Sequence, residues 1–283
     1  MVKEGEPPTG REKDGIVNAG SDRPQRAGPE RSSTLVKGMA VFRAFDDART
    51  HMTLAEIAGV TDLDRATVRR LVLTLVQLGY LRRDERRFSL SPRVLTLAGN
   101  FLRGNRFGTL VQPLLDRCAV RIGTTVSLAV VDEQAAVYVA QSTTTDSDVT
   151  FGFTVGSRLP LLHTAIGRAA LAFGDPVWSA DVVRDAAFER YTADTTMARD
   201  QIARRVADCK VAGYSVVDGE FEAGVTGFAV PVGWPGELCA VIGTSRSTAA
   251  VRDESVRVIT IDHLRHAAGE LDRSGVFSIG GAR

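Results

Sequence analysis

Apolar residues recur at helical spacing from about residue 33 onward. Residues 1–30 precede this pattern and hold four prolines and almost no large apolar side chains. Because such a segment cannot bury enough surface to offset its ordering entropy, we predict a disordered tail there. The first predicted helix begins near Ser33, and its apolar face consists of Leu35, Met39, Phe42 and Phe45.

Two further helices are predicted from their N-terminal signals. Thr53 and Glu56 form a capping box, in which each side chain can bond the backbone amide of the other, and we expect that helix to end at Gly59. Asp64 is the expected N-cap of the next helix, which Gly79 ends. The apolar residues of this third helix follow the i, i+3, i+4, i+7 series: Val68, Leu71, Val72, Leu75 and Leu78.

A β-hairpin is predicted over residues 80–90, with its tip at Asp84-Glu85 and arginines on both sides of it. Two helices joined by a short turn and followed by a basic hairpin are typical of a winged helix-turn-helix domain. The second helix would place its first side chains against base edges in the major groove, with the hairpin on phosphates. The predicted DNA-binding residues are Arg65, Thr67 and Arg70 near the bases, with Arg69, Arg82, Arg83, Arg86 and Arg87 on the phosphates.

The distribution of charge favours DNA as the partner of this part of the chain. Residues 31–106 hold 14 basic and 7 acidic side chains, whereas residues 107–283 hold 16 basic and 21 acidic ones. The near-neutral total therefore hides a basic block that could bind a polyanion. A basic block alone is more often a solvated face, and the arginines of the hairpin are what favour double-stranded DNA.

Pro92 opens a further helical stretch, which we interpret as a linker helix that ends near Gly108. Its exposed apolar stripe would suit a dimer contact, and winged helices normally read symmetric half-sites as dimers. The stripe consists of Val94, Leu95, Ala98, Phe101 and Leu102.

Beyond residue 109 the pattern predicts an α+β domain, in which helices pack against a mostly antiparallel sheet. Helices are predicted over residues 110–122, 165–173, 198–212 and 249–272. Strands are predicted over residues 125–131, 136–141, 149–154, 214–217, 225–231 and 238–244, with a loop at 156–160.

Composition excludes several classes of protein. No apolar run approaches the roughly 18 residues that span a bilayer, and the first residues lack the apolar stretch of a secretion signal, so we expect a cytoplasmic protein without a membrane partner. Cys118, Cys209 and Cys239 are too few and too scattered for a disulfide framework or a zinc cage. His263 and His266 lack a third ligand, so neither a metal nor a cofactor is expected.

Several strings of residues resemble the IclR family of bacterial transcription regulators. In the helical block they are Thr53-Leu-Ala-Glu-Ile-Ala, Asp64-Arg-Ala-Thr-Val-Arg-Arg-Leu, Leu78-Gly-Tyr-Leu and Arg87-Phe-Ser-Leu-Ser-Pro-Arg-Val-Leu. In the second block they are Val155-Gly-Ser-Arg-Leu-Pro, His163-Thr-Ala-Ile-Gly-Arg-Ala-Ala-Leu-Ala, Gly213-Tyr-Ser-Val-Val-Asp-Gly-Glu and Ala229-Val-Pro. The resemblance covers residues 33–272 and looks strongest to the subgroup that controls protocatechuate, 4-hydroxybenzoate and β-ketoadipate catabolism.

The resemblance implies both the domains and the effector site. The implied domains are a winged helix-turn-helix over residues 31–91, a linker helix over 92–108 and a GAF-like effector-binding domain over 109–274, followed by a tail over 275–283. The implied partners are operator DNA, a small carboxylate effector and further copies of the chain, as homodimers or dimers of dimers. Carried over by motif, the effector-binding residues are His163, Thr164, Ala165, Ile166, Asp218, Glu220 and Gly227.

The chain departs from the family pattern at His163, Gly219 and Gly227, so its effector can differ from that of the subgroup. The amides at the start of the helix over 165–173 offer an anion site whatever the side chains are. His163 could add a donor to that site or simply pack, and Arg158 could bind a carboxylate or lie in a surface loop.

Asp218 and Glu220 lie two apart on an extended segment, so we expect them to share a face. There they could bind a ligand hydroxyl, do acid–base work or face water. Our leading interpretation is a ligand-responsive transcription regulator with no catalytic residues, in which the effector changes the geometry of the dimer and hence operator affinity. The alternative is an enzyme that acts on a small carboxylate through Asp218, Glu220 and His163, although no nucleophile elbow, phosphate loop or metal-ligand set accompanies them.

Overall fold

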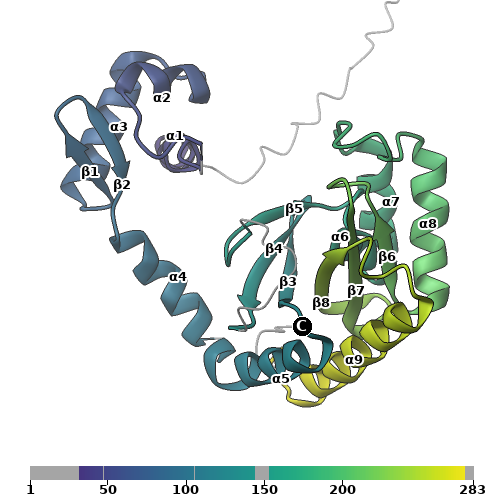
Figure 1. The fold of residues 1–283 in the computed structure, drawn as a ribbon. Helices are drawn as coiled ribbons and strands as arrows, with labels where there is room; N and C mark the ends of the chain where they lie inside the picture. Colours follow the sequence, from purple (N-terminus) through teal and green to yellow (C-terminus); the bar gives the residue numbers. More distant parts are fainter. Residues whose placement is uncertain (1–31, 47, 105, 144–152, 278–283) are drawn as a thin grey trace, which may run out of the picture. The chain divides into compact units, whose positions relative to one another are not determined.

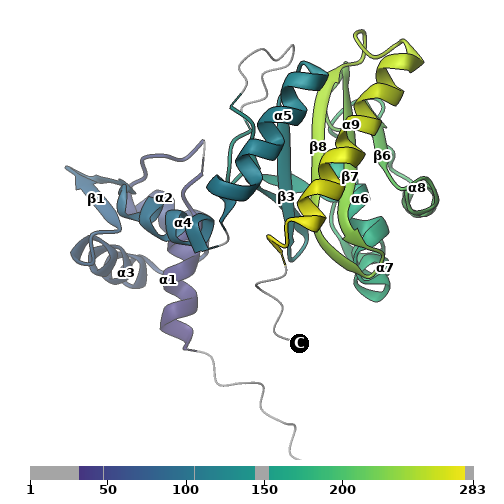
Figure 2. The same cartoon turned by 90° about the horizontal axis from the view of Figure 1, so that it is seen from below.

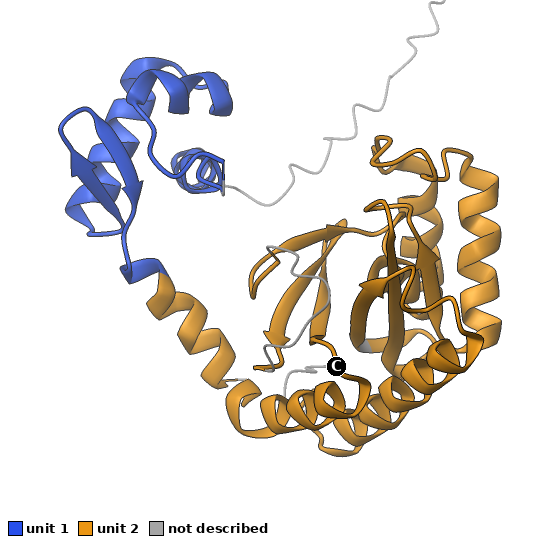
Figure 3. Ribbon diagram, in the orientation of Figure 1, with its two compact units in different colours: residues 1–94 blue, residues 95–283 orange. Residues whose placement is uncertain are grey.

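The computed structural model describes residues 32–46, 48–104, 106–143 and 153–277, and its contacts divide the chain into two compact units, residues 1–94 and 95–283 (Figure 1, Figure 3). The tail predicted over residues 1–30 lies outside the described residues. So does most of the strand predicted over 149–154, of which residues 153 and 154 are not in a strand. Within the described ranges, no helix combines the length and the apolar character needed to cross a bilayer.

The first unit packs three helices against a two-stranded hairpin. The predicted caps are present: Thr53 and Glu56 form the capping box, and Asp64 accepts a hydrogen bond from the amide of Thr67 at 2.8 Å. An antiparallel bridge between Met52 and Phe88 holds the hairpin to the residue that precedes the capping box. The elements are α1 Ser33–Arg43, α2 Leu54–Thr61, α3 Arg65–Gln77, β1 Leu81–Asp84 and β2 Arg87–Leu90.

The inner face of α1 differs from the predicted one. Leu35 and Met39 are exposed, and the residues buried in or just after this helix are Val41, Ala44 and Phe45. Only the C-terminal half of α1 thus reaches the core that α2 and α3 share, so the apolar residues of its first two turns are left uncovered.

Two helix ends and the hairpin tip also need correction. Helix α2 runs past Gly59 to Thr61, because the left-handed residue that ends it is Asp62, with φ 54°. Leu78 is the C-cap of α3 and is exposed rather than inward-facing. The hairpin tip lies at Glu85-Arg86, one residue later than predicted, since Asp84 pairs with Arg87.

The linker helix is shorter than predicted. Helix α4, Arg93–Gly104, ends four residues before Gly108, and a turn of π-helix, η1 Phe107–Val111, leads into α5 Gln112–Ile122. No residue of α4 is fully buried, whereas Phe107 and Val111 are. The π-turn is therefore where the chain enters the core of the second unit.

The second unit is built on a six-stranded antiparallel sheet in the order β5-β4-β3-β8-β7-β6. Helices α5 and α9 cover one face, and α6, α7 and α8 lie on the other (Figure 2). The strands are β3 Val126–Asp132, β4 Ala135–Gln141, β5 Arg158–Pro160, β6 Ser215–Asp218, β7 Val225–Trp234 and β8 Glu237–Ser247. The remaining helices are α6 Ala165–Phe173, α7 Pro176–Asp185, α8 Arg199–Ala212 and α9 Glu254–Arg273. The α+β class with a mostly antiparallel sheet is confirmed.

Three elements of this unit depart from the predicted pattern. Part of the predicted loop at 156–160 is the short edge strand β5, which pairs with β4. Helix α7 was not predicted at all. Helix α9 begins at Glu254 rather than near Ala249, because Asp253 is its N-cap and accepts a hydrogen bond from the amide of Ser255.

Candidate functional site

The predicted DNA-binding residues of the first unit lie on two elements, the N-terminal part of α3 and the hairpin β1–β2. Thr67 is half-buried, and all seven arginines are exposed. Five of these arginines make no side-chain hydrogen bond or ion pair with another described residue: Arg65, Arg69, Arg70, Arg82 and Arg86. Their guanidinium groups are available to an anionic partner.

The other two arginines of the hairpin have contacts within the unit. Arg87 donates to the carbonyl oxygen of His51 at 2.9 Å and lies 3.8 Å from a carboxylate oxygen of Glu56. The Nε of Arg83 donates to the carbonyl oxygen of Glu85 at 2.9 Å. Arg87 therefore ties the hairpin to the start of α2, and Arg83 bonds the hairpin tip.

The start of α6 packs directly on the sheet of the second unit. Thr164 is its N-cap and uses its hydroxyl fully, accepting from the amide of Gly167 at 3.0 Å and donating to the carbonyl of Pro160 at 2.7 Å. A Cβ atom on Gly227 would lie 3.2 Å from the Cβ of Ala165. The amides of the first residues of a helix have no acceptor inside it, so this end of α6 presents donors to an anion.

His163 precedes this N-terminus and is completely buried. Its ring packs against two aromatic rings, with centroid distances of 5.1 Å to Phe188 and 5.7 Å to Tyr191. Neither ring nitrogen has a hydrogen-bond partner among the described residues. The carboxylate of Glu220 lies 3.7 Å from Nδ1, which is within ion-pair distance. A buried polar group without a partner is costly, so a bound molecule that supplies one would be stabilised here.

Glu220 is buried as well, but its carboxylate is fully engaged. Arg168 of α6 binds both oxygens, at 2.8 and 2.7 Å, Arg205 of α8 binds one of them, and the amide of Thr196 donates at 3.1 Å. Burial acts to raise the pKa of Glu220, but the neighbouring His163, the hydrogen bonds and the charge of Arg168 outweigh it and hold that pKa well below its usual range. The charged carboxylate of Glu220 therefore links α6, α8 and the segment before α8.

Asp218 does not share a face with Glu220, so that expectation is wrong. Strand β6 ends at Asp218, and Gly219 follows with φ 65°, which turns the chain. The carboxylate of Asp218 accepts two hydrogen bonds from Arg257 of α9, at 2.8 and 3.2 Å, and one from the hydroxyl of Thr226 at 2.6 Å. It lies towards α9, across the sheet from α6.

Three further features of this site were not predicted from the sequence: Arg168, Arg205 and the segment 186–198. The hydroxyl groups of Thr192 and Thr195 in that segment donate to the backbone carbonyls of Gly219 and Glu220. Arg168 had a visible signal, because it stands inside a run of small apolar residues in the His163-Thr-Ala-Ile-Gly-Arg string. Arg205 and the threonines had none, since each lies in an ordinary polar stretch.

A row of aromatic rings continues outward from His163. The ring centroid of Tyr191 lies 4.9 Å from that of Phe221, which lies 6.0 Å from Phe153, and Phe153 lies 6.4 Å from Tyr138. Phe153 is partly buried and packs against the core on the α6 side of the sheet. Flat apolar walls of this kind suit an aromatic molecule.

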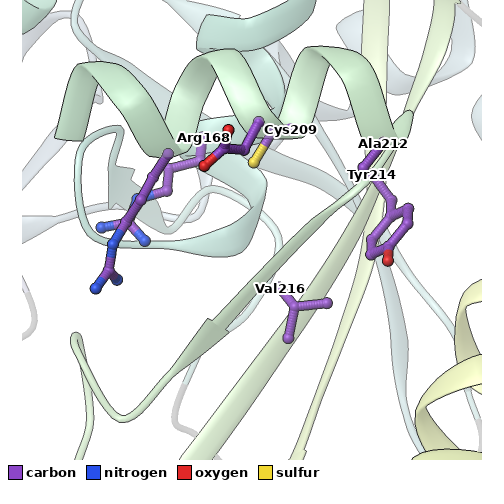
Figure 4. A pocket seen from close by; sticks show the side chains of 7 residues that line it. Arg168, Cys209, Ala212, Tyr214 and Val216 are labelled. Carbon is purple, nitrogen blue, oxygen red and sulfur yellow. The ribbon is translucent and has the colours of Figure 1, made fainter. Parts of the chain in front are cut away.

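An open groove of about 330 Å³ lies between α8 and β6 (Figure 4). It is lined by Arg168, Arg205, Asp208, Cys209, Ala212, Tyr214 and Val216. Arg158 belongs neither to this groove nor to the site at the start of α6, because it forms an ion pair with Asp132 on the surface.

Candidate metal ligands do not gather in the described part of the chain, where no cluster of three His, Cys, Asp or Glu side chains has the geometry for an ion. His266 instead lies 3.3 Å from Glu270. Cys118 and Cys209 are buried free thiols, as expected of small hydrophobic residues, and burial raises the pKa of Cys118 to about 11.

Each of the two units matches a known protein family model. Residues 34–85 match the family model of the IclR helix-turn-helix domain, and residues 103–273 match that of the bacterial transcriptional regulator IclR C-terminal region. The chain is 31% identical to the Pca regulon regulatory protein of Pseudomonas putida, over 79% of this chain and 77% of that one. It is 28% identical to the p-hydroxybenzoate hydroxylase transcriptional activator of Acinetobacter baylyi, over 84% and 89%.

A solved structure of a related protein has a similar fold. The IclR homolog of Microbacterium hydrocarbonoxydans, crystallised with 4-hydroxybenzoate, has a TM-score of 0.70 and 25% identity, covering 85% of this chain and 98% of that one. The relatives are named as regulators of transcription. Of the three groups in the enzymatic alternative, Asp218 lies across the sheet from His163 and Glu220, so the three do not form one site. The protein is thus a regulator and not an enzyme, with relatives in aromatic catabolism. The chain belongs to the IclR family of bacterial transcription regulators.

Proposed function

We propose that this regulator binds operator DNA as a dimer and that a small carboxylate metabolite, an aromatic acid or a ring-cleavage product, controls its affinity for that DNA. The observation that carries the effector part is the buried His163, directly before the N-terminus of α6, whose two ring nitrogens make no hydrogen bond in the described structure. The winged helix-turn-helix over 31–91 would bind DNA, the linker helix over 92–108 would connect it, and the domain over 109–274 would hold the effector.

In this proposal the effector carboxylate accepts hydrogen bonds from the amides of Ala165 and Ile166, where the helix dipole also favours an anion. His163 donates to or accepts from a polar substituent of the ligand. The neighbouring rings of Phe188 and Tyr191 supply apolar walls. Thr164, Gly227 and Glu220 shape the site rather than bind the ligand. Thr164 and Glu220 already form hydrogen bonds within the protein, and Gly227 allows the close approach of Ala165.

The DNA-binding part rests on the five arginines of α3 and the hairpin whose side chains bond no other described residue. Arg65, Arg70 and Thr67 would face base edges, with Arg69, Arg82 and Arg86 on phosphates. Arg83 and Arg87 would add positive charge while holding the hairpin in place. A regulator of transcription acts where the DNA is, so the cytoplasm is its expected compartment.

Exposed apolar side chains on two helices favour a dimer. Helix α1 exposes Leu35, Val36 and Met39, and helix α4 exposes Leu95, Leu97 and Phe101. Exposed apolar side chains on a regulator that reads symmetric half-sites are expected to pack against a second copy. Pairing of such dimers into tetramers is the state that the family resemblance implies.

The direct test is a binding titration with DNA from upstream of the protein's own gene, in the presence of non-specific competitor and at two salt concentrations. 4-Hydroxybenzoate and protocatechuate would be added in parallel. Competitor-resistant binding that falls steeply with salt and changes with an acid supports the proposal. Binding that competitor removes, unchanged by either acid, contradicts it.

His163→Ala tests the effector site by itself. We expect the acid concentration for half-maximal effect to rise about five- to tenfold, since a lost hydrogen bond is worth about 1 to 1.4 kcal/mol. Operator affinity without acid should stay the same. Arg158→Ala is the matched control, because that surface arginine is outside the site and should leave both quantities unchanged. An unaltered acid response in His163→Ala would contradict the proposed ligand geometry.

A further inference from the structure

Two strings of the helical block, Leu78-Gly-Tyr-Leu and Ser91-Pro-Arg-Val-Leu, meet at one point in the structure. It is the place where α3 ends and α4 begins. Three hydrogen bonds join the strings there. The amide of Ser91 donates to the carbonyl of Tyr80 at 2.8 Å, its hydroxyl donates to the carbonyl of Gly79 at 2.5 Å, and Nη1 of Arg93 donates to the carbonyl of Leu78 at 2.5 Å.

The bond from Arg93 has a clear electrostatic reason. Leu78 is the C-cap of α3, and carbonyls at a helix C-terminus lack amide partners within the helix and carry the negative end of its dipole. A guanidinium group is well suited to this position, because it donates charge-assisted hydrogen bonds to helix-terminal carbonyls.

Gly79 makes room for this contact. Its φ of 78° lies in the left-handed region, where glycine is favoured. A Cβ atom at this position would also lie 2.8 Å from Nη1 of Arg93. The glycine thus serves both the turn after α3 and the close approach of the arginine from α4.

Ser91 completes the connection from the other side. It is buried, and its hydroxyl oxygen accepts a hydrogen bond from the amide of Arg93 at 3.2 Å while it donates to Gly79. The first residue of α4 is therefore held through its backbone by Ser91 and through its side chain by the end of α3.

We propose that Ser91 and Arg93 form a clamp that holds the start of α4 to the end of α3, and that these positioning residues thereby set the half-site spacing that the regulator accepts. The proposal rests on the proposed function, dimeric DNA binding included. Helix α4 carries the exposed apolar side chains proposed to meet a second copy, and α3 carries the side chains proposed to meet the bases. Holding the start of α4 to the end of α3 would restrict how far apart the two α3 helices of a dimer can lie.

The experiment uses the full chain and an operator located in its upstream DNA. A series of operators is then made in which the spacer between half-sites grows or shrinks by single base pairs, together with a DNA that holds one half-site. Wild type, Arg93→Ala, Arg93→Lys and Arg103→Ala are titrated against each DNA. Arg103→Ala is the matched control, because Arg103 lies on the same helix and its side chain bonds only Asn100 among the described residues.

We expect wild type and Arg103→Ala to prefer one spacing sharply. Arg93→Ala should bind the preferred operator about tenfold more weakly, which corresponds to about 1.4 kcal/mol, and should lose the preference among neighbouring spacings. Its affinity for the single half-site should not change. A variant that had lost its fold would instead bind the single half-site more weakly as well. Arg93→Lys should recover part of the preference, because an ammonium group can still donate to the carbonyl of Leu78.

The outcomes separate this proposal from the proposed function. If wild type shows no specific binding or no spacing preference, the proposed function fails first. If wild type shows the preference and Arg93→Ala keeps the same profile, the clamp is overturned. A parallel loss on the single half-site would also overturn it, because the contact would then serve folding of the unit and not the geometry of the dimer.

Discussion

The carboxylate of Glu220 is almost fully buried between two arginines, so its charge and the folding of the second unit depend on each other. Glu220→Gln leaves Arg168 buried without its counter-charge, and breaking a buried pair in this way costs about 3 kcal/mol or more. We expect urea unfolding at pH 7 to show that loss. Arg158→Ala breaks only an exposed pair and should change the free energy of unfolding by about 0.5 kcal/mol or less.

The lowered pKa of Glu220 also makes the free energy of unfolding depend on pH. Its pKa in the folded protein lies below the usual value of 4.5, so the unfolded chain binds the proton more readily. Stability from this group is therefore complete above about pH 5 and is lost as pH falls through the folded pKa. Unfolding curves of wild type should shift steadily below about pH 5, and the shift should be smaller in Glu220→Gln. An equal shift in both proteins would assign the acid sensitivity to other carboxylates.

At the scale of elements, α6 shows how close packing can reverse the usual effect of a glycine substitution. A Cβ on Gly167 would overlap backbone atoms of Leu161, so Gly167→Ala should destabilise the protein by about 1–3 kcal/mol. Gly59 in α2 has no atom within 4 Å of its Cβ position, and Gly59→Ala should stabilise by about 0.5–1 kcal/mol. Opposite signs in urea unfolding confirm the packing; a stabilised Gly167→Ala would show that α6 lies farther from Leu161.

The elements that local signals define were predictable. Capping groups at Thr53 and Asp64 placed α2 and α3, and the small-residue run placed α6 to the residue. Part of what was not predictable depends on contacts distant in sequence, since strand β5 exists because β4 offers it an edge. The separation of Asp218 from Glu220 has a local cause instead, the left-handed turn at Gly219 between them. Of the candidate effector site, the sequence indicated His163 and Glu220, but the arginines that bind Glu220 come from two different helices, α6 and α8.

At the scale of the whole molecule, the formal net charge of +1 would suggest weak attraction to DNA. Binding depends instead on where the charge lies, and the block of residues 31–106 holds twice as many basic as acidic side chains. Each phosphate contact made by an arginine contributes about −0.9 to the slope of log affinity against log salt. Operator binding should therefore weaken steeply with salt despite the near-neutral total.

Arg82 and Arg86 allow this to be tested without disturbing the unit, because neither side chain has a partner among the described residues. Arg82→Ala with Arg86→Ala should make the salt slope shallower by about 2 and weaken binding about equally on all DNA sequences. Arg87→Ala is expected to act differently, since it also releases the hairpin from His51 and Glu56 and so lowers the free energy of unfolding. Should the double variant keep the full slope, the phosphates must be bound by another surface. The hairpin would then serve to support α3, and the basic charge of the first unit would act through α3 alone.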